Sequence, residues 1–380
     1  MKFSFFQILL QKYYKLKTSG SRTKRSEIDE YGFKRNETFD YAAYETFMSE
    51  YIGVLAKRAK KWTGILPLFT AKNNPAWAKS KKVKRYLRKG IPIDHRPQIW
   101  MIISNAAELK KSIHQARHYG TGGYYAFMLN NKILDPDIGE TIRTDLPRTF
   151  PENIFFRNSL EHQQQLSRIL KVFALDEKDI GYCQGLNYIA ALILLVTKHE
   201  ENTYWIFRSV VNKYFSDYYT KTLTGVVRDI DVLSELVRIK MPHLYDHIAK
   251  VGVPWPVIAT KWFICMFADV LPVETVLRIW DCLFVEGPKI LFRVALTLLK
   301  LNERALLDCD DFSTLVDCMK SMTRAPAVLN CHSFMSQIFK IPGTLKRSTI
   351  DTLRTEVEKK LSQERLKQKR MSVKTTIRDR

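Results

Sequence analysis

Apolar side chains recur every three or four residues along most of the chain, the spacing expected when one face of a helix is buried. In the first clear segment this spacing follows Thr38, a favourable helix cap, and it predicts a helix that runs to about Trp62. The apolar stripe of this helix consists of Phe39, Ala43, Phe47, Tyr51 and Leu55.

Further helical segments follow one another with short connections. Gly90 ends one of them, Pro97 begins the next, Asn158 or Ser159 caps a third and Asn202 caps a fourth. The predicted helices cover residues 77–89, 97–103, 160–173, 186–197, 203–214, 226–240, 257–269, 273–283, 289–302, 311–320 and 333–340. No segment shows the alternating pattern and tight turns of a β-hairpin. The sequence therefore predicts an all-α protein with more than ten helices.

The charge of the chain is high and unevenly distributed. The 61 Lys and Arg residues and 39 Asp and Glu residues give a net charge of +22. Residues 1–90 contribute 21 − 7 = +14 and residues 343–380 contribute 12 − 5 = +7, whereas residues 91–342 contribute only 28 − 27 = +1. A groove for nucleic acid would need this charge on the folded core, so we expect no specific nucleic-acid partner. The flanks are predicted to be solvated arms or to make weak contact with an anionic membrane.

These patterns divide the chain into four parts. We expect a basic, flexible N-terminal arm over residues 1–37, an N-terminal helical extension over 38–87 and a folded domain over 88–345. Residues 346–380 are charged and helix-prone, which predicts a helical or disordered tail.

Several classes of protein are excluded. The six cysteines contain no Cys-x-x-Cys pair and lie in apolar patterns, which indicates buried free thiols in a reducing cytosol. The apolar run near the N-terminus is too short and interrupted for a signal sequence, and no run approaches the ~20 residues of a spanning helix. We expect a cytoplasmic protein that associates at most peripherally with endomembranes.

Metal and cofactor sites are not expected either. The pairs His114/His118 and His243/His247 have helical spacing, but the second lacks the glutamate of a zinc-protease motif. Three cysteines and one histidine near the C-terminal end of the domain could also suggest a metal site, and these are Cys309, Cys318, Cys331 and His332. Their spacing is not that of a zinc finger. The chain also has no phosphate-binding loop and no kinase motif. We therefore expect it to have no nucleotide-binding site of its own.

Two segments place a polar residue close to a helix boundary. In the first, Pro147 and Pro151 interrupt regular helix, so Arg148 should project from a turn, and Asp145 three residues earlier can hold its guanidinium. From local physics alone, the favoured interpretation is a structural Arg–Asp pair in a proline-rich loop.

The second segment is Tyr182-Cys183-Gln184-Gly185, between Gly181 and an apolar helix. The two glycines allow close approach of another surface, and the rigid helix would fix the position of the glutamine. On local grounds the glutamine could simply cap the helix.

Together the motifs resemble the TBC domain of Rab GTPase-activating proteins. The resemblance rests on four motifs in order over about 200 residues, namely Arg88-Lys89-Gly90-Ile91-Pro92 with Arg96 and Trp100, Ile142-x-x-Asp145-x-x-Arg148, Tyr182-Cys183-Gln184-Gly185, and Arg278-Ile279-Trp280-Asp281-Cys282. It identifies residues 88–345 as the domain and implies a V-shaped, all-helical fold. Segments around Tyr31 and Tyr44 indicate a particular subgroup of the family.

The resemblance also implies a mechanism. Arg148 and Gln184 occupy the positions of an arginine finger and a glutamine finger, which such domains supply in trans to a GTP-bound Rab during vesicle-mediated transport. Asp145 would orient Arg148, while Tyr182 and Asn187 would shape the loops. GTP and Mg²⁺ would be carried by the GTPase. The alternative is a non-catalytic adaptor that binds a Rab at a membrane.

Overall fold

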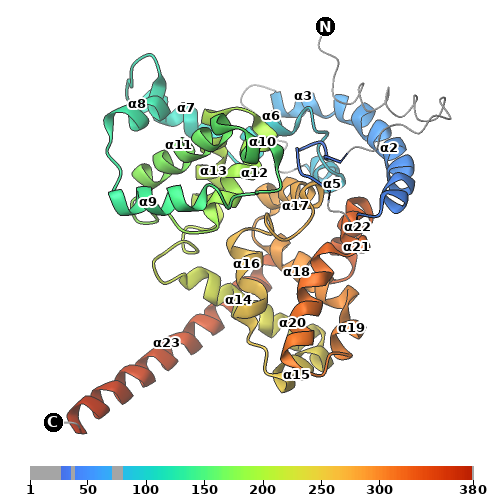
Figure 1. Ribbon diagram of the computed structural model, residues 1–380, viewed down its shortest axis with the longest axis vertical. Helices are drawn as coiled ribbons and strands as arrows, with labels where there is room; N and C mark the ends of the chain where they lie inside the picture. Colours follow the sequence, from blue (N-terminus) through green and yellow to red (C-terminus); the bar gives the residue numbers. More distant parts are fainter. Residues whose placement is uncertain (1–26, 36–38, 71–79, 379–380) are drawn as a thin grey trace.

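The computed structural model describes residues 27–35, 39–70 and 80–378, and within them it contains helices and no β-strand, so the all-α prediction is confirmed. Figure 1 shows two lobes. The N-terminal elements are α2 (Tyr41–Thr63), α3 (Leu66–Thr70), α5 (Lys81–Lys89) and α6 (Arg96–Ile103). The first lobe contains α7 (Ala106–Ala116), α8 (Gly123–Asn131), α9 (Pro136–Asp145), α10 (Ile154–Asn158), α11 (Leu160–Asp176), α12 (Leu186–Thr197) and α13 (Glu200–Tyr214).

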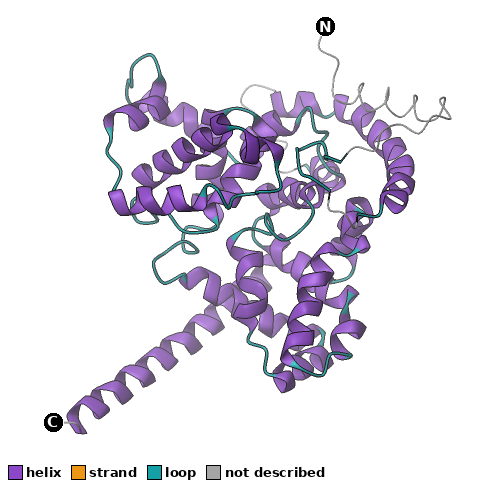
Figure 2. Cartoon of the chain, viewed as in Figure 1, coloured by secondary structure: helices purple, strands orange, loops and turns teal. Residues whose placement is uncertain are grey.

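The second lobe follows in the sequence, and Figure 2 shows how its helices are joined by short loops. It contains α14 (Thr224–Lys240), α15 (Pro242–Val251), α16 (Trp255–Ile264), α17 (Val273–Glu286), α18 (Lys289–Leu301), α19 (Glu303–Leu307) and α20 (Phe312–Ser321). The chain ends with a short 3₁₀ helix (Met322–Arg324), α21 (Pro326–Leu329), α22 (Cys331–Lys340) and the long α23 (Arg347–Arg378).

Helix α17 joins the N-terminal helices to the second lobe, because it contacts α5 and α6 as well as α18 and α22. Its Asp281 is fully buried and accepts hydrogen bonds from the backbone N–H of Ile91, the guanidinium of Arg96 and the indole of Trp100, at 2.9–3.2 Å. A buried carboxylate is tolerable only when it is fully hydrogen-bonded and paired. The motif residues Arg96, Trp100 and Asp281 thus form a structural anchor.

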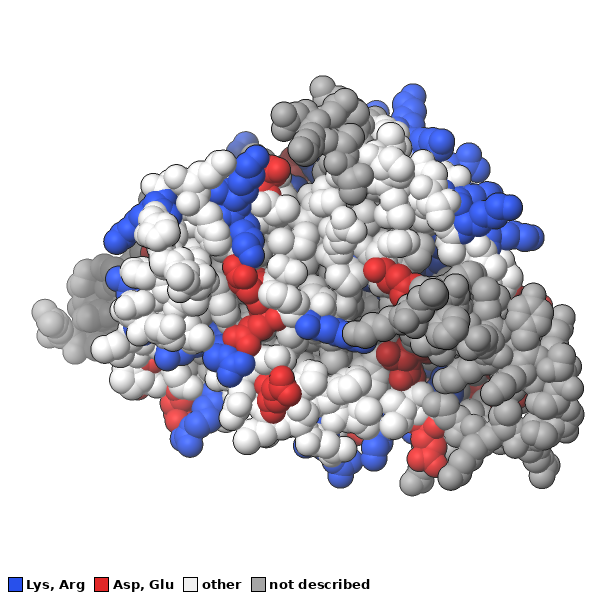
Figure 3. Space-filling view, turned by 90° about the horizontal axis from the view of Figure 1, so that it is seen from above, with Lys and Arg blue, Asp and Glu red and all other residues white. Residues whose placement is uncertain are grey.

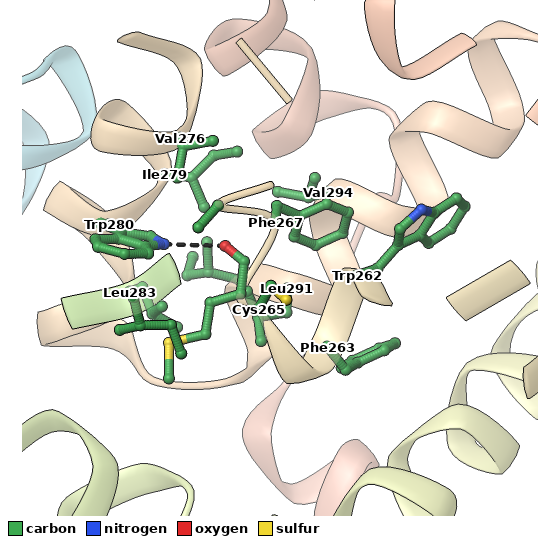
Figure 4. Close-up of a cluster of buried hydrophobic side chains, with 14 of the residues drawn as sticks. Trp262, Phe263, Cys265, Phe267, Val276, Ile279, Trp280, Leu283, Leu291 and Val294 are labelled. Carbon is green, nitrogen blue, oxygen red and sulfur yellow. Dashed lines mark hydrogen bonds between the residues drawn. The ribbon is translucent and has the colours of Figure 1, made fainter. Parts of the chain in front are cut away.

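The chain turns sharply after α16, where the sequence predicted that the helix would continue to residue 269. The helix ends at Ile264 because Met266 and Phe267 have φ of 48° and 65°, which a helix excludes. Figure 4 shows the tertiary cause: Phe267 lies in a buried cluster with residues of α17 and α18, and the Trp280 indole donates to the Met266 carbonyl at 3.0 Å.

Other helix boundaries also differ from the predictions. The cap of α13 is His199, whose ring accepts from the backbone N–H of Asn202, so Asn202 is not the cap. Asp40 caps α2, and the predicted cap Thr38 lies outside the described residues, as does Trp77. Ser80 caps α5, and Ser159 caps α11 as predicted. The predictions did not include α3, α7–α10, α15, α19 or α21, all of which have fewer than twelve residues.

Part of the predicted flexible arm is ordered. Residues 1–26 lie outside the described residues, but residues 27–35 form a turn in which the Asp29 carboxylate accepts from the backbone of Tyr31 and Phe33. Tyr31 is only 6% exposed, and its hydroxyl bonds Glu274 and Arg96. Burial of the aromatic ring, together with the hydrogen bonds of its hydroxyl, offsets the entropy lost when this segment becomes ordered. The sequence did not predict this order because the residues around Tyr31 are mostly polar.

One of the two predicted boundaries of the folded domain falls inside a helix, and the other falls between two helices. The boundary between residues 87 and 88 falls inside α5, whereas that between 345 and 346 falls just before α23. The first turns of α23 pack on α14, where the Arg354 guanidinium binds the buried Asp229 carboxylate.

None of the described helices has the length and apolarity needed to cross a membrane. The six cysteines are free thiols, but three of them are half-buried and not buried as predicted: Cys183 and Cys309 lie in loops, and Cys318 lies on α20. No cluster of potential metal ligands exists among the described residues. One histidine of each pair makes a structural hydrogen bond: the His114 ring accepts from the backbone N–H of Tyr124, and the His247 ring bonds the Cys309 carbonyl.

Candidate functional site

The first part of the site is the turn that follows α9. The helix ends at Asp145, and the chain leaves the turn through Phe150, which has a φ of 50°. The Phe150 ring holds this conformation because it packs edge-on against Phe33 and Tyr188, each with ring centroids 5.2 Å away. Arg148 thereby projects from the turn, and half of its side chain is exposed.

Asp145 connects this turn to the second predicted segment. Its fully buried carboxylate accepts from the Arg148 guanidinium through one oxygen and from the Tyr182 hydroxyl, at 2.5 Å, through the other. Burial raises the pKa of Tyr182, and the neighbouring Asp145 raises it further, so the hydroxyl stays protonated and can donate. The predicted contact between Asp145 and Arg148 is therefore present, and Tyr182 shares the same carboxylate.

The second part of the site is the loop of residues 181–185. Gly185 has a φ of 112°, and a Cβ there would lie 3.3 Å from the backbone and side chain of Ile264 in α16, so this position requires glycine. Helix α12 begins immediately afterwards and is buried along almost its whole length. Gln184 is exposed, and its amide makes no hydrogen bond to any residue that the structure describes. A rigid base thus presents a free amide to the surface.

A buried chain of hydrogen bonds joins the two loops directly. The Asn187 side chain accepts from the backbone N–H of Gly185 at 3.0 Å and donates to the Thr149 hydroxyl at 2.8 Å. The Thr149 hydroxyl in turn donates to the Asp145 carbonyl at 2.7 Å. Both side chains are almost completely buried, at 0% and 1% exposure. The residue after Arg148 is therefore tied to the residue after Gln184.

Sequence reasoning missed two of these residues. Thr149 directly follows Arg148, and a hydroxyl between an arginine and a proline-flanked turn could have suggested a bonded role. Tyr188 donates from its hydroxyl to the Arg148 carbonyl at 3.2 Å, but an aromatic residue inside an apolar helix gives no sign of such a contact.

The chemistry of the site is that of donors and acceptors rather than of titrating groups. A guanidinium offers several N–H donors in a plane, and a primary amide offers both a donor and an acceptor. Burial, and then the charge of Asp145, raises the pKa of Cys183, so this thiol is protonated at neutral pH and is a poor nucleophile. The arrangement can therefore bind and orient a phosphate group and a water molecule.

Comparison with known proteins assigns this architecture to a family. The sequence model of the Rab-GTPase-TBC domain matches residues 93–307, and the chain belongs to this family of Rab GTPase-activating domains. The expected membership is thus confirmed.

The relatives also confirm the subgroup. The chain is 42% identical to growth hormone-regulated TBC protein 1-A of Danio rerio, over 88% of this chain and 91% of that protein. It is 41% identical to growth hormone-regulated TBC protein 1 of Homo sapiens, over 90% of this chain and 97% of that protein.

Solved structures share the fold. The Chlamydomonas flagellar RabGAP TBC domain is 28% identical and superposes with a TM-score of 0.65, covering 82% of this chain and 99% of that one. The Ypt/Rab-GAP domain of Gyp1p, at 20% identity, has a TM-score of 0.61 over 76% of this chain and 98% of that one.

Proposed function

We propose that this protein accelerates GTP hydrolysis by one or more GTP-bound Rab proteins and supplies Arg148 and Gln184 in trans. The observation that carries the proposal is that Arg148 and Gln184 are exposed on two loops that are joined to each other. The Asp145 carboxylate binds Arg148 of one loop and Tyr182 of the other, and the Thr149–Asn187 hydrogen bond joins the loops a second time. A guanidinium and an amide held on one rigid base suit a transition state in which charge develops on phosphate oxygens while water attacks.

Each residue has a defined part in this mechanism. The Arg148 guanidinium gives up part of its contact with the Asp145 carboxylate and donates hydrogen bonds to the phosphate oxygens of the bound nucleotide. An arginine finger of this kind in general raises kcat by about 10³–10⁵. Gln184 accepts from the attacking water and donates to a phosphate oxygen. Asp145, Tyr182 and Asn187 position the two fingers and do not touch the nucleotide. GTP and Mg²⁺ belong to the GTPase, so the protein needs no cofactor of its own.

The cellular setting is part of the same proposal. A Rab partner places the protein in vesicle-mediated transport, working from the cytoplasm at the surface of endomembranes, where an anionic lipid surface can contribute weakly to binding. The proposal includes no specific nucleic-acid partner.

The deciding experiment is single-turnover GTP hydrolysis by a panel of purified, GTP-loaded Rab proteins in the presence of the wild-type chain, Arg148→Ala or Gln184→Ala. Acceleration of one or a few Rabs by the wild type, lost in both variants, is the expected result. Binding to a GTP-loaded Rab without acceleration would establish the alternative, a non-catalytic adaptor.

A further inference from the structure

Six of the 21 Lys and Arg residues among residues 1–90 lie on the folded helix α5. This helix has six Lys and Arg residues among its nine, and it packs against α17 and α22. Figure 3 shows Lys and Arg side chains gathered along one edge of the molecule with no acidic side chains among them. The folded domain therefore has a basic surface of its own.

Between α5 and α22 lies a groove of about 560 Å³, which we call the basic groove. Its described lining contains no Asp or Glu, and Met335, Ser336 and Phe339 supply its neutral part. Its basic lining consists of Lys81, Lys84, Arg85, Arg88, Lys89, Arg278, Lys340 and the half-buried His332.

The neighbouring carboxylate compensates only part of this charge. Glu286 is buried, and its carboxylate binds Arg88 at 2.6 Å, Lys84 at 3.3 Å and Lys289 at 2.9 Å. One negative charge is thus shared by three cations. Three further cations of the groove are exposed and form no ion pair within the described part of the chain, and these are Lys81, Arg85 and Lys89.

The floor of the groove adds a buried cation. Arg278 is 1% exposed, and its guanidinium donates to the Tyr51 hydroxyl and to the Arg88 carbonyl, at 3.0 and 3.2 Å, but to no described carboxylate. The Nε of the same side chain has no acceptor. Burial lowers the pKa of Arg278, whereas the nearby charges of Glu274 and Asp281 are among the causes that raise it, so the guanidinium stays charged and those carboxylates balance part of its charge. The part that they do not balance adds to the positive potential of the groove.

The titration of two side chains agrees with a positive potential. Burial lowers the pKa of His332, and the charges of Arg278, Arg58 and Lys89 lower it further. The pKa of Lys89 is lowered by burial and then by Arg85, Lys61 and Arg58. An anion that entered the groove would relieve this repulsion.

We propose that the basic groove binds the phosphate-bearing headgroup of an anionic membrane lipid, so that the folded domain itself docks on a membrane. The volume suits a single headgroup, and Phe339 and Met335 offer apolar contact to the adjoining glycerol and acyl region. Lys81, Arg85 and Lys89 are spaced by four residues along one face of α5, so they can contact neighbouring headgroups at the same time. This inference does not depend on the proposed GTPase activation and is tested by binding alone.

The test is co-sedimentation of the full-length chain with phosphatidylcholine vesicles that either contain or lack phosphatidylserine. The groove variant is Lys81→Gln with Arg85→Gln, which removes two exposed charges that make no ion pair. Two matched variants also remove two positive charges each: Lys15→Gln with Lys17→Gln in the N-terminal arm, and Lys250→Gln with Arg304→Gln on exposed positions of α15 and α19. Thermal unfolding checks that all three variants fold.

The wild type is expected to bind only the anionic vesicles and to release them as salt increases. At about 1 kcal/mol per basic residue near a membrane surface, the groove variant should bind about 30-fold more weakly, and the α15–α19 variant should match the wild type. Failure of the wild type to bind, or equal binding by the groove variant, overturns the proposal. Loss of binding in the arm variant with full binding in the groove variant assigns the membrane contact to the flank and overturns it too.

Discussion

The side-chain amide of Asn187 donates a 2.8 Å hydrogen bond to the hydroxyl of Thr149, although the two residues are 38 positions apart in the sequence. Each of them directly supports one of the two loops of the candidate site, and both are buried. Because buried hydrogen bonds are costly to break, this contact fixes the distance between the loops that carry Arg148 and Gln184.

The Thr149 hydroxyl should be essential to this coupling. Thr149→Val keeps the shape but leaves the Asn187 amide without its acceptor, so we expect a loss of about 1–3 kcal/mol in the free energy of unfolding and weaker stimulation of GTP hydrolysis. Thr149→Ser retains the hydroxyl and should restore most of the stimulation. Urea denaturation and single-turnover hydrolysis measure the two effects. Full stimulation by the valine variant would show that the bond does not position the fingers.

Arg148→Lys separates charge from geometry. Lysine keeps a positive charge beside Asp145, so the fold should be retained, but it lacks the planar set of donors, and stimulated hydrolysis should fall by about 10³-fold or more. Single-turnover kinetics with a responsive Rab measures the rate, and circular dichroism checks the fold. A lysine variant that stimulates almost as well as the wild type would contradict the role of an arginine finger.

Gln184→Ala should affect activity without affecting stability. The side chain is exposed and its amide has no described partner, so the free energy of unfolding should change by less than about 0.5 kcal/mol. Stimulated hydrolysis should fall by about 10²–10³-fold, as for other single donors lost from a transition state. Gln115→Ala, at another exposed glutamine on α7, is the matched control and should behave as the wild type in both assays.

Tyr182→Phe tests the shared carboxylate. The change removes a 2.5 Å bond to buried Asp145, so we expect a destabilisation of about 1.5–3 kcal/mol together with reduced stimulation. Tyr188→Phe removes a longer bond, of 3.2 Å, to the neutral Arg148 carbonyl, and it should cost only about 0.5–1.5 kcal/mol. Equal effects of the two variants would argue against a special role for Asp145.

Glu286 should contribute a pH-dependent part of the stability. Burial alone would raise the pKa of Glu286, but hydrogen bonds from Arg88 and Lys289 lower it to about 2. Because the pKa is lower in the folded state, the contribution of about 3 kcal/mol is fully present above the ordinary glutamate pKa of about 4.3 and is lost as the pH falls toward 2.

Glu286→Gln should therefore be destabilised at pH 7 by up to about 3 kcal/mol, and the difference from the wild type should narrow below pH 4. Urea denaturation of both proteins between pH 7 and pH 3 measures this difference. A gap that stays constant over the whole range would mean that the carboxylate charge is not what stabilises this region.

Local patterns in the sequence predicted what depends on neighbours along the chain. The spacing of apolar residues predicted most of the long helices, and the spacing of Asp145 and Arg148 predicted a contact that needs only one helical turn. The ordered motifs identified the family, and with it the two residues proposed as fingers.

The errors arose where distant contacts override local preference. The segment after Ile264 is apolar enough to continue as a helix, but the Trp280 indole and the buried Phe267 ring hold it in a turn. Tyr31 lies in a polar segment, but burial of its ring and its bonds to Glu274 and Arg96, which are distant in the sequence, help to order it.

The sequence by itself determined the helical class, the family and the chemical nature of Arg148 and Gln184. Only the tertiary structure decided that Asn187 meets Thr149, that Tyr182 and Arg148 share one carboxylate, and that the charge of α5 faces a groove beside α22. The physical reason is that periodicity and capping act over a few residues, whereas these contacts are made by packing between elements that are far apart in the chain.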